Sequence, residues 1–179
     1  HNVMINHARN GLFETLQEMG AKLKIFNEKK VNNEFTASIY AEYSKLKGLS
    51  VPSERAPRMI DEYPILSMAA ACAEGRTTMN GISELRVKES DRIKIVSNGL
   101  NRVGIKTIEK PDSLKIFGGE IIGGCTIDSE LDHRIAMSFL ILGLVSNKPI
   151  KVLRPSTIKT SFPNFFEMML NLGSKFVKG

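Results

Sequence analysis

Apolar residues recur along the chain in two patterns, which predict two kinds of helix. In the first kind they lie three and four positions apart and a glycine follows the last of them, at residues 11–20, 92–104 and 162–173. This spacing predicts an amphipathic helix with one buried stripe, a left-handed glycine cap and a strand after it. The inward stripes would hold Leu12, Leu16 and Met19, then Ile93, Val96, Leu100 and Val103, then Phe165, Met169 and Leu172.

The second kind of helix is apolar on nearly every face. It covers residues 61–75 and 132–146, and a strand-like run follows each. A helix without a polar face is expected to be buried on all sides. Alternating runs at 34–43, 113–118 and 124–129 predict further strands. We therefore expect an α/β fold of repeated βαβαββ-type units, with buried helices inside and sheets outside, and the unit recurs about twice.

Composition places the chain among soluble globular proteins. Its 179 residues are 42% hydrophobic and 25% charged, which excludes a disordered chain, a collagen-like chain and a disulfide scaffold. Cys72 and Cys125 have no partner at metal-ligand spacing, so we expect no cysteine zinc site and a reducing, cytoplasmic compartment. The apolar run at 135–145 is too short to cross a bilayer. No signal peptide is recognised and the first residue is not Met, so we interpret the chain as a piece of a longer protein.

The chain is basic, with a net charge of +6 and a pI near 9.4. Such a charge is compatible with binding to nucleic acid, to an anionic membrane surface or to phosphorylated small molecules. Lys and Arg are spread along the whole length without an aromatic-interleaved RNA-binding motif. We therefore expect most of them on a solvated surface.

Three charged clusters stand at predicted helix starts. Asp61 begins the first buried helix, where it could act as an N-cap or, partly desolvated, as a general base. Lys88 and Arg92 lie four positions apart before an amphipathic helix, and a helical turn there would put both on one side. Cations oppose the helix dipole at an N-terminus, but together with the free N–H groups they form an anion site. Ser90 or Asp91 is the expected cap of this helix.

The third cluster places Arg134 in the first turn of the second buried helix, two residues after Asp132. One interpretation is a surface pair between these two side chains. The other is that Arg134 binds an anion, because its guanidinium suits bidentate recognition of carboxylate or phosphate. His133 between them is as compatible with a structural hydrogen bond as with proton transfer.

Four stretches resemble, in order and spacing, the C-terminal part of the 5-enolpyruvylshikimate-3-phosphate synthase family. They are residues 59–64 (MIDEYP), 85–92 (LRVKESDR), 132–137 (DHRIAM) and 160–166 (TSFPNFF). The similarity runs through essentially the whole chain and is closest to the bacterial branch that includes glyphosate-tolerant enzymes. It implies a transferase of aromatic amino-acid biosynthesis that joins the enolpyruvyl group of phosphoenolpyruvate to the 5-hydroxyl of shikimate 3-phosphate and releases phosphate. The family needs no metal or organic cofactor.

The resemblance also implies roles for five residues. Asp61 matches the carboxylate that contacts the shikimate hydroxyls and accepts a proton, and Lys88 matches the lysine near the reacting hydroxyl. Glu89 matches the acid that protonates the methylene carbon of phosphoenolpyruvate. Arg92 and Arg134 match the arginines that hold phosphoenolpyruvate.

The chain departs from the family pattern in three ways. Some members have asparagine where Glu84 stands, and the C-terminal lysine that touches phosphoenolpyruvate in many members is not assigned, because Thr160 rather than Lys159 takes the matching position. The family's N-terminal phosphate-binding and shikimate-phosphate motifs do not occur. We therefore expect residues 1–179 to be the C-terminal portion of an enolpyruvyl transferase, mostly one domain, without its partner domain. Such a chain would hold half an active site and be inactive alone.

Two alternative functions stay open at this point. The sister family that transfers enolpyruvyl to UDP-N-acetylglucosamine shares fold and chemistry, although the motifs at residues 88–92 (KESDR) and 132–137 (DHRIAM) argue against it. A non-catalytic module that binds anions or RNA would also suit a basic chain, and its RNA affinity would fall steeply with salt. The expected partners are shikimate 3-phosphate, phosphoenolpyruvate and the missing N-terminal part, with no nucleic acid and no membrane.

Overall fold

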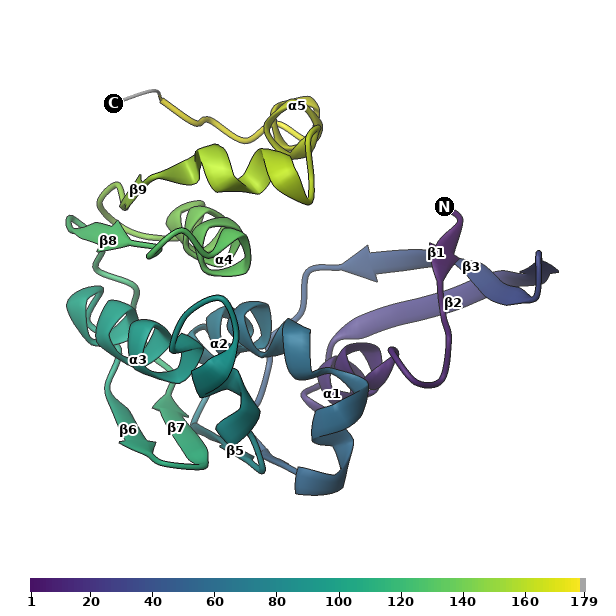
Figure 1. Cartoon of the computed structure of the whole chain (residues 1–179), viewed down its shortest axis with the longest axis horizontal. Coiled ribbons are helices and arrows are strands. Elements are labelled where there is room, and N and C mark those ends of the chain that lie inside the picture. Colours follow the sequence, from purple (N-terminus) through teal and green to yellow (C-terminus); the bar gives the residue numbers. More distant parts are fainter. Residues whose placement is uncertain (178–179) are drawn as a thin grey trace.

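The computed structural model describes residues 1–177 and confirms the predicted alternation of helices and strands. Its central helices are α2 (Tyr63–Ala71), α3 (Arg92–Arg102) and α4 (His133–Gly143), and three small sheets lie outside them (Figure 1). One continuous cluster of buried apolar side chains joins these helices to the sheets. Within residues 1–177, none of the helices has the length and apolar character needed to cross a membrane.

The first unit combines one helix with a three-stranded antiparallel sheet. Its elements are β1 (Val3–Met4), α1 (Gly11–Glu18), β2 (Lys22–Val31) and β3 (Glu34–Glu42). The strands lie in the order β1-β3-β2. Met19 is fully buried, and Leu12 and Leu16 pack against the core, as the spacing predicts. Gly20 follows with a φ of +93°, in the left-handed region that favours glycine at a helix end.

The second unit has a four-stranded sheet in the order β4-β5-β7-β6. Its strands are β4 (Ser50–Val51), β5 (Arg76–Asn80), β6 (Thr107–Lys110) and β7 (Ser113–Phe117). Short 3-10 segments carry the chain between sheet and helices: η1 (Ser53–Arg58), η2 (Ile60–Glu62) and η3 (Ser83–Val87). The predicted inward stripe of α3 is confirmed, because Ile93, Val96, Leu100 and Val103 are all buried.

The third unit contains β8 (Thr126–Asp128), β9 (Lys151–Leu153), η4 (Pro155–Thr160) and α5 (Phe165–Asn171). Two predictions fail here. Leu172 is 74% exposed instead of facing inward, and residues 174–177 form no strand. The cause is an aromatic cluster: Phe176 turns back against α5, where its ring centroid lies 5.7 Å from that of Phe166 and 6.3 Å from that of Phe165. This contact satisfies the apolar side chain without a sheet.

The two apolar helices differ in burial. Most residues of α2 are buried, which confirms the prediction for this helix. The prediction is wrong for α4: Leu140 and Ile141 are only half-buried, and Val145 just beyond its end is 61% exposed. One side of α4 packs against α2, and it also contacts β9 and η4. The helix also contacts α3, and the half-buried Leu140 and Ile141 still pack against the core.

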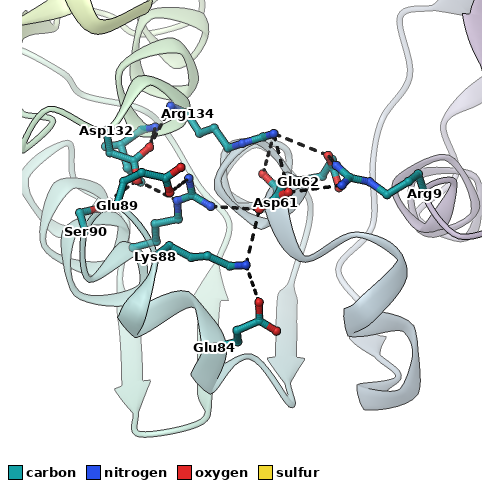
Figure 2. A network of polar contacts seen from close by, with 11 residues as sticks. Arg9, Asp61, Glu62, Glu84, Lys88, Glu89, Ser90, Asp132 and Arg134 are labelled. Carbon is teal, nitrogen blue, oxygen red and sulfur yellow. Dashed lines mark hydrogen bonds and ion pairs between the residues drawn. The ribbon is translucent and has the colours of Figure 1, made fainter. Parts of the chain in front are cut away.

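The strand order confirms the internal repeat. In the first and second units a strand, an amphipathic helix and an antiparallel hairpin follow one another, giving β1-β3-β2 and β5-β7-β6. In the second and third units a buried helix joins two parallel neighbours, β4-β5 and β8-β9. The two helices, α2 and α4, thus each connect two strands of one sheet. Their N-terminal ends lie close to one another, because the side chain of Arg134 at the start of α4 reaches Asp61 just before α2 (Figure 2).

Candidate active site

Asp61 lies in η2, one residue before the N-cap position of α2. Glu62 occupies that position, and no side chain accepts a hydrogen bond there. The N-cap interpretation of Asp61 is therefore wrong. Pro64, in the first turn as predicted, has no N–H group and reduces the need for a capping acceptor. The Asp61 carboxylate, 22% exposed, is left to form ion pairs instead.

Four cationic side chains converge on the Asp61 carboxylate (Figure 2). Oδ1 lies 3.3 Å from Arg92 Nη1 and 4.0 Å from Lys88 Nζ, whereas Oδ2 lies 3.4 Å from Arg9 Nη1 and 3.8 Å from Arg134 Nη2. Burial alone would raise the pKa of Asp61. The charges of Arg134, Lys88, Arg9 and Arg92 outweigh this effect and hold the pKa below its ordinary value, so the group is ionised at neutral pH.

Lys88 and Arg92 meet at the same oxygen, although not through helical spacing. Lys88 follows η3 in an extended conformation, with φ −78° and ψ −152°, and Arg92 is the first residue of α3. Asp91 caps α3, as one of the two predicted caps, because its side chain accepts a hydrogen bond from Lys94 N at 3.0 Å. Lys88 also bonds the carboxylate of Glu84 and is 23% exposed, so its ammonium can still reach solvent.

Arg92 lies at the base of the cluster, with its side chain only 1% exposed. Its Nε donates to Asp132 Oδ2 at 2.8 Å and its Nη2 to Glu89 Oε2 at 2.5 Å, in addition to the contact with Asp61. The Glu89 side chain is 52% exposed and extends from this guanidinium towards solvent. Three carboxylates from three segments of the chain thus share one buried cation.

Asp132 is fully buried and caps α4. It accepts the backbone N–H groups of Arg134 at 2.9 Å and Ile135 at 3.3 Å, and the Ser90 hydroxyl donates to it at 3.0 Å. Burial alone would raise its pKa, but the hydrogen bond and charge of Arg92, with these donors, hold the pKa below its ordinary value. The alternative of an Asp132–Arg134 surface pair is wrong, because Asp132 bonds only the backbone of Arg134.

The side chain of Arg134 points towards Asp61 instead. Its Nη1 donates to the Asp61 carbonyl oxygen at 3.2 Å and lies 3.6 Å from Glu62 Oε1. The side chain is 32% exposed, so an anion can reach it. Its position in the first turn of α4 is the one predicted from the sequence.

Two members of the cluster, Arg9 and Glu62, were not singled out by sequence reasoning. Arg9 precedes α1, and its Nη2 donates to Glu62 Oε1 at 2.9 Å. The two residues are separated by 53 positions. Arg9 belongs to no apolar stripe and to none of the quoted motifs, so no signal in a single sequence could have found it.

The charges of the cluster nearly balance. Its cations are Arg9, Lys88, Arg92 and Arg134, and its carboxylates are Asp61, Glu62, Glu84, Glu89 and Asp132. An ionised carboxylate beside partly exposed cations can accept a proton from a hydroxyl group while the cations bind an anion. Within residues 1–177, no group of His, Cys, Asp and Glu has an arrangement that could hold a metal ion.

The chain is similar to known proteins along most of its length. The family model of EPSP synthase (3-phosphoshikimate 1-carboxyvinyltransferase) matches residues 1–169. A 3-phosphoshikimate 1-carboxyvinyltransferase of a Chelativorans species is 50% identical over 177 residues, which are 97% of this chain and 39% of the relative. The enzyme of Brucella melitensis is also 50% identical, over 99% of this chain and 40% of its own length.

Solved structures show the same relationship. An EPSP synthase of Acinetobacter baumannii superposes with a TM-score of 0.91 at 43% identity, covering 94% of this chain and 40% of that one. The enolpyruvyl transferase NikO of Streptomyces tendae, at 18% identity and a TM-score of 0.67, shares the fold. The chain spans about two-fifths of the length of the curated relatives it matches. With most of its residues matched by the family model, the chain belongs to the EPSP synthase family.

Proposed function

We propose that this chain supplies part of the active site of an enzyme that transfers the enolpyruvyl group of phosphoenolpyruvate to the 5-hydroxyl of shikimate 3-phosphate and releases phosphate. The observation that carries the proposal is the convergence of Lys88, Arg92 and Arg134 on Asp61, with Glu89 on the same guanidinium. The acceptor follows from the name of the relatives, 3-phosphoshikimate 1-carboxyvinyltransferase.

In this proposal Asp61 receives the proton of the reacting hydroxyl. A carboxylate with a lowered pKa is a weak base, and the four cations lower it here. Lys88 and Arg134 are partly exposed, so they can turn towards the anionic groups of the substrates. Because their charge would then be shared with the substrates, the proton affinity of Asp61 would rise when the site is filled.

Glu89 and Arg92 act at phosphoenolpyruvate. Glu89 is proposed to donate the proton to the methylene carbon after it has left Arg92 and taken up a proton from water, and its half-exposed carboxyl group is compatible with reaching a substrate outside the cluster. Arg92 is buried, so Glu89 must move aside before the guanidinium can contact the carboxylate or phosphate of this substrate. Asp132 would remain in place and hold the buried guanidinium throughout.

The charge balance supports the proposal that other parts of the parent protein complete the site. Four cations face five carboxylates, so the cluster carries a formal charge of minus one. Two anionic substrates need more positive charge than this arrangement offers. We infer that the C-terminal portion present here is mostly one domain, that the missing N-terminal part contributes further cations, and that the chain alone is inactive. The proposed compartment is the cytoplasm, without membrane or nucleic-acid partners.

Phosphate release by the complete parent protein tests this function. The protein receives phosphoenolpyruvate with either shikimate 3-phosphate or UDP-N-acetylglucosamine, and the 179-residue chain is assayed beside it. We expect turnover with shikimate 3-phosphate only, and none by the chain alone. Asp61→Asn and Glu89→Gln should each lower kcat at least about 100-fold. Glu167→Gln, an exposed change in the first turn of α5, is the matched control and should be active.

Three results would contradict the proposal. Turnover by the 179-residue chain would refute the inference that the missing N-terminal part completes the active site. Turnover with UDP-N-acetylglucosamine would change the acceptor. A folded parent protein without turnover on either acceptor would refute the activity, and a salt-dependent RNA titration would then test the binding module instead.

A further inference from the structure

Arg9 is the member of the cluster that neither the motifs nor the proposed substrate contacts explain. It lies between β1 and α1 in a segment with a fixed backbone. Asn6 Oδ1 accepts a hydrogen bond from Ala8 N at 2.9 Å, and the Asn6 carbonyl accepts one from Arg9 N at 2.8 Å. Arg58 Nε donates to the His7 carbonyl at 2.8 Å. The guanidinium of Arg9 is therefore presented from an anchored turn.

This guanidinium bridges two neighbouring carboxylates. Nη2 donates to Glu62 Oε1 at 2.9 Å, and Nη1 lies 3.4 Å from Asp61 Oδ2 (Figure 2). The two carboxylate side chains are 20% and 22% exposed and the Arg9 side chain is 42% exposed, so the contacts are shielded from water on the carboxylate side only. Asp61 has no capping bond to fix its side chain, and its orientation is set by these cations.

The oxygens of Asp61 are divided between two pairs of cations. Lys88 and Arg92 face Oδ1, whereas Arg9 and Arg134 face Oδ2. Under the proposed function, the other three cations bind substrate and must loosen or share their contacts with Asp61. Arg9 is the cation of the cluster to which the family resemblance assigns no substrate contact. It can hold Oδ2 in place while Oδ1 receives the hydroxyl proton.

We propose that Arg9 is a positioning residue for this reaction: by bridging Asp61 Oδ2 and Glu62 it keeps Oδ1 of Asp61 directed towards the reacting hydroxyl. This inference rests on the proposed function. Arg9 itself contacts neither substrate, so its loss acts on the chemical step and leaves substrate affinity nearly intact. Misplacing a reacting group by about 1 Å can lower a rate by up to about 100-fold.

The test uses the complete parent enzyme with Arg9→Gln, Arg9→Lys and the control Arg102→Gln, an exposed arginine in the last turn of α3. For Arg9→Gln we expect kcat to fall about tenfold with the KM values for both substrates within about twofold. Because a cation near Asp61 is lost, the acid limb of the kcat–pH profile should move to higher pH. Arg9→Lys should restore the position of the limb and part of kcat.

An NMR titration of the Asp61 carboxyl carbon gives a readout that is independent of turnover. Its signal is assigned by its loss in Asp61→Asn, and its titration should move to higher pH in Arg9→Gln and stay in place in Arg102→Gln. Unchanged kcat in Arg9→Gln would overturn the inference. So would an acid limb that does not move in Arg9→Gln together with a kcat of Arg9→Lys no higher than that of Arg9→Gln. An inactive wild-type enzyme would instead refute the proposed function, so the two failures are distinguishable.

Discussion

Replacing Asp132 by Asn tests the buried charges at the base of the cluster. Asparagine has nearly the same shape and caps a helix about as well as aspartate, so the cap of α4 is kept. The change removes the negative charge opposite Arg92 Nε, which lies 2.8 Å away. Asp132 is 0% exposed and Arg92 only 1%, so water cannot replace the lost partner.

The expected loss follows from what remains around Arg92. Removing one partner of a buried ion pair costs about 3–5 kcal/mol when the other charge is left alone. Arg92 keeps Glu89, which is half-exposed, and Asp61, which is shared with other cations. We therefore expect the lower end of this range, about 3 kcal/mol. With a urea dependence of about 2 kcal/mol per molar, the unfolding midpoint should fall by about 1.5 M.

Equilibrium urea unfolding of the 179-residue chain, followed by far-UV circular dichroism, measures this loss. Asp132→Ala also removes the cap and should cost about 1 kcal/mol more than Asp132→Asn. The control is Asp128→Asn, which removes an exposed carboxylate paired with the exposed Arg154 and should leave the midpoint unchanged. If Asp132→Asn unfolded at the midpoint of this control, the reasoning about the buried pair would be refuted.

Four further predictions concern buried residues, and three of these predictions concern stability. Gly99→Ala would place a Cβ 2.2 Å from Phe139 Cζ, so the ring must move; we expect a loss of about 1–3 kcal/mol, and an unchanged thermal melt would contradict it. Tyr63→Phe removes a buried hydroxyl that has no hydrogen-bond partner within residues 1–177, so the free energy of unfolding should rise by about 1 kcal/mol; a loss in urea unfolding would show that the hydroxyl is needed. Burial raises the pKa of Tyr63 to about 12, so the Tyr63 hydroxyl stays mostly protonated at pH 11. At that pH the tyrosinate absorbance of Tyr63→Phe should therefore be nearly the same as that of wild type. The contacts that lower the pKa of Asp132 stabilise the folded chain fully above the ordinary pKa of 3.8, and this stabilisation is lost as the pH falls through the folded-state pKa. Below pH 3.8 the free energy of unfolding of wild type should therefore fall more steeply with pH than that of Asp132→Asn.

Helices and strands with a clear pattern could be predicted from the sequence. The stripe of α3 and the glycines after α1 and α3 fix both the faces and the ends of these helices. Apart from the alternating run at 34–43, which became β3, residues 27–58 could be placed only loosely. A bulge between Phe26 and Lys29 breaks the alternation of β2, and η1 has no helical period to detect.

The candidate site was predictable as far as its residues lie in motifs. Asp61, Glu89 and Arg134 come from three such stretches, and the structure brings them into one cluster. The ion pairs that these side chains form in the folded chain were not predictable. Asp61 is no cap because it lies one residue before the N-cap position of α2, and its carboxylate pairs with four cations. One of them, Arg9, comes from a turn 52 positions earlier that is bonded to Arg58. Such contacts depend on tertiary structure rather than on local propensity.

The sharing of Arg92 also limits how homologues can be recombined. Its three carboxylate partners come from the segments before α2, before α3 and at the start of α4. A chimera that exchanges one of these segments for a sequence without the matching charge would bury an uncompensated guanidinium. The three segments are therefore transferable only as a set. The choice of crossover points is thus limited more strictly by the charge balance around Arg92 than by the ends of helices and strands.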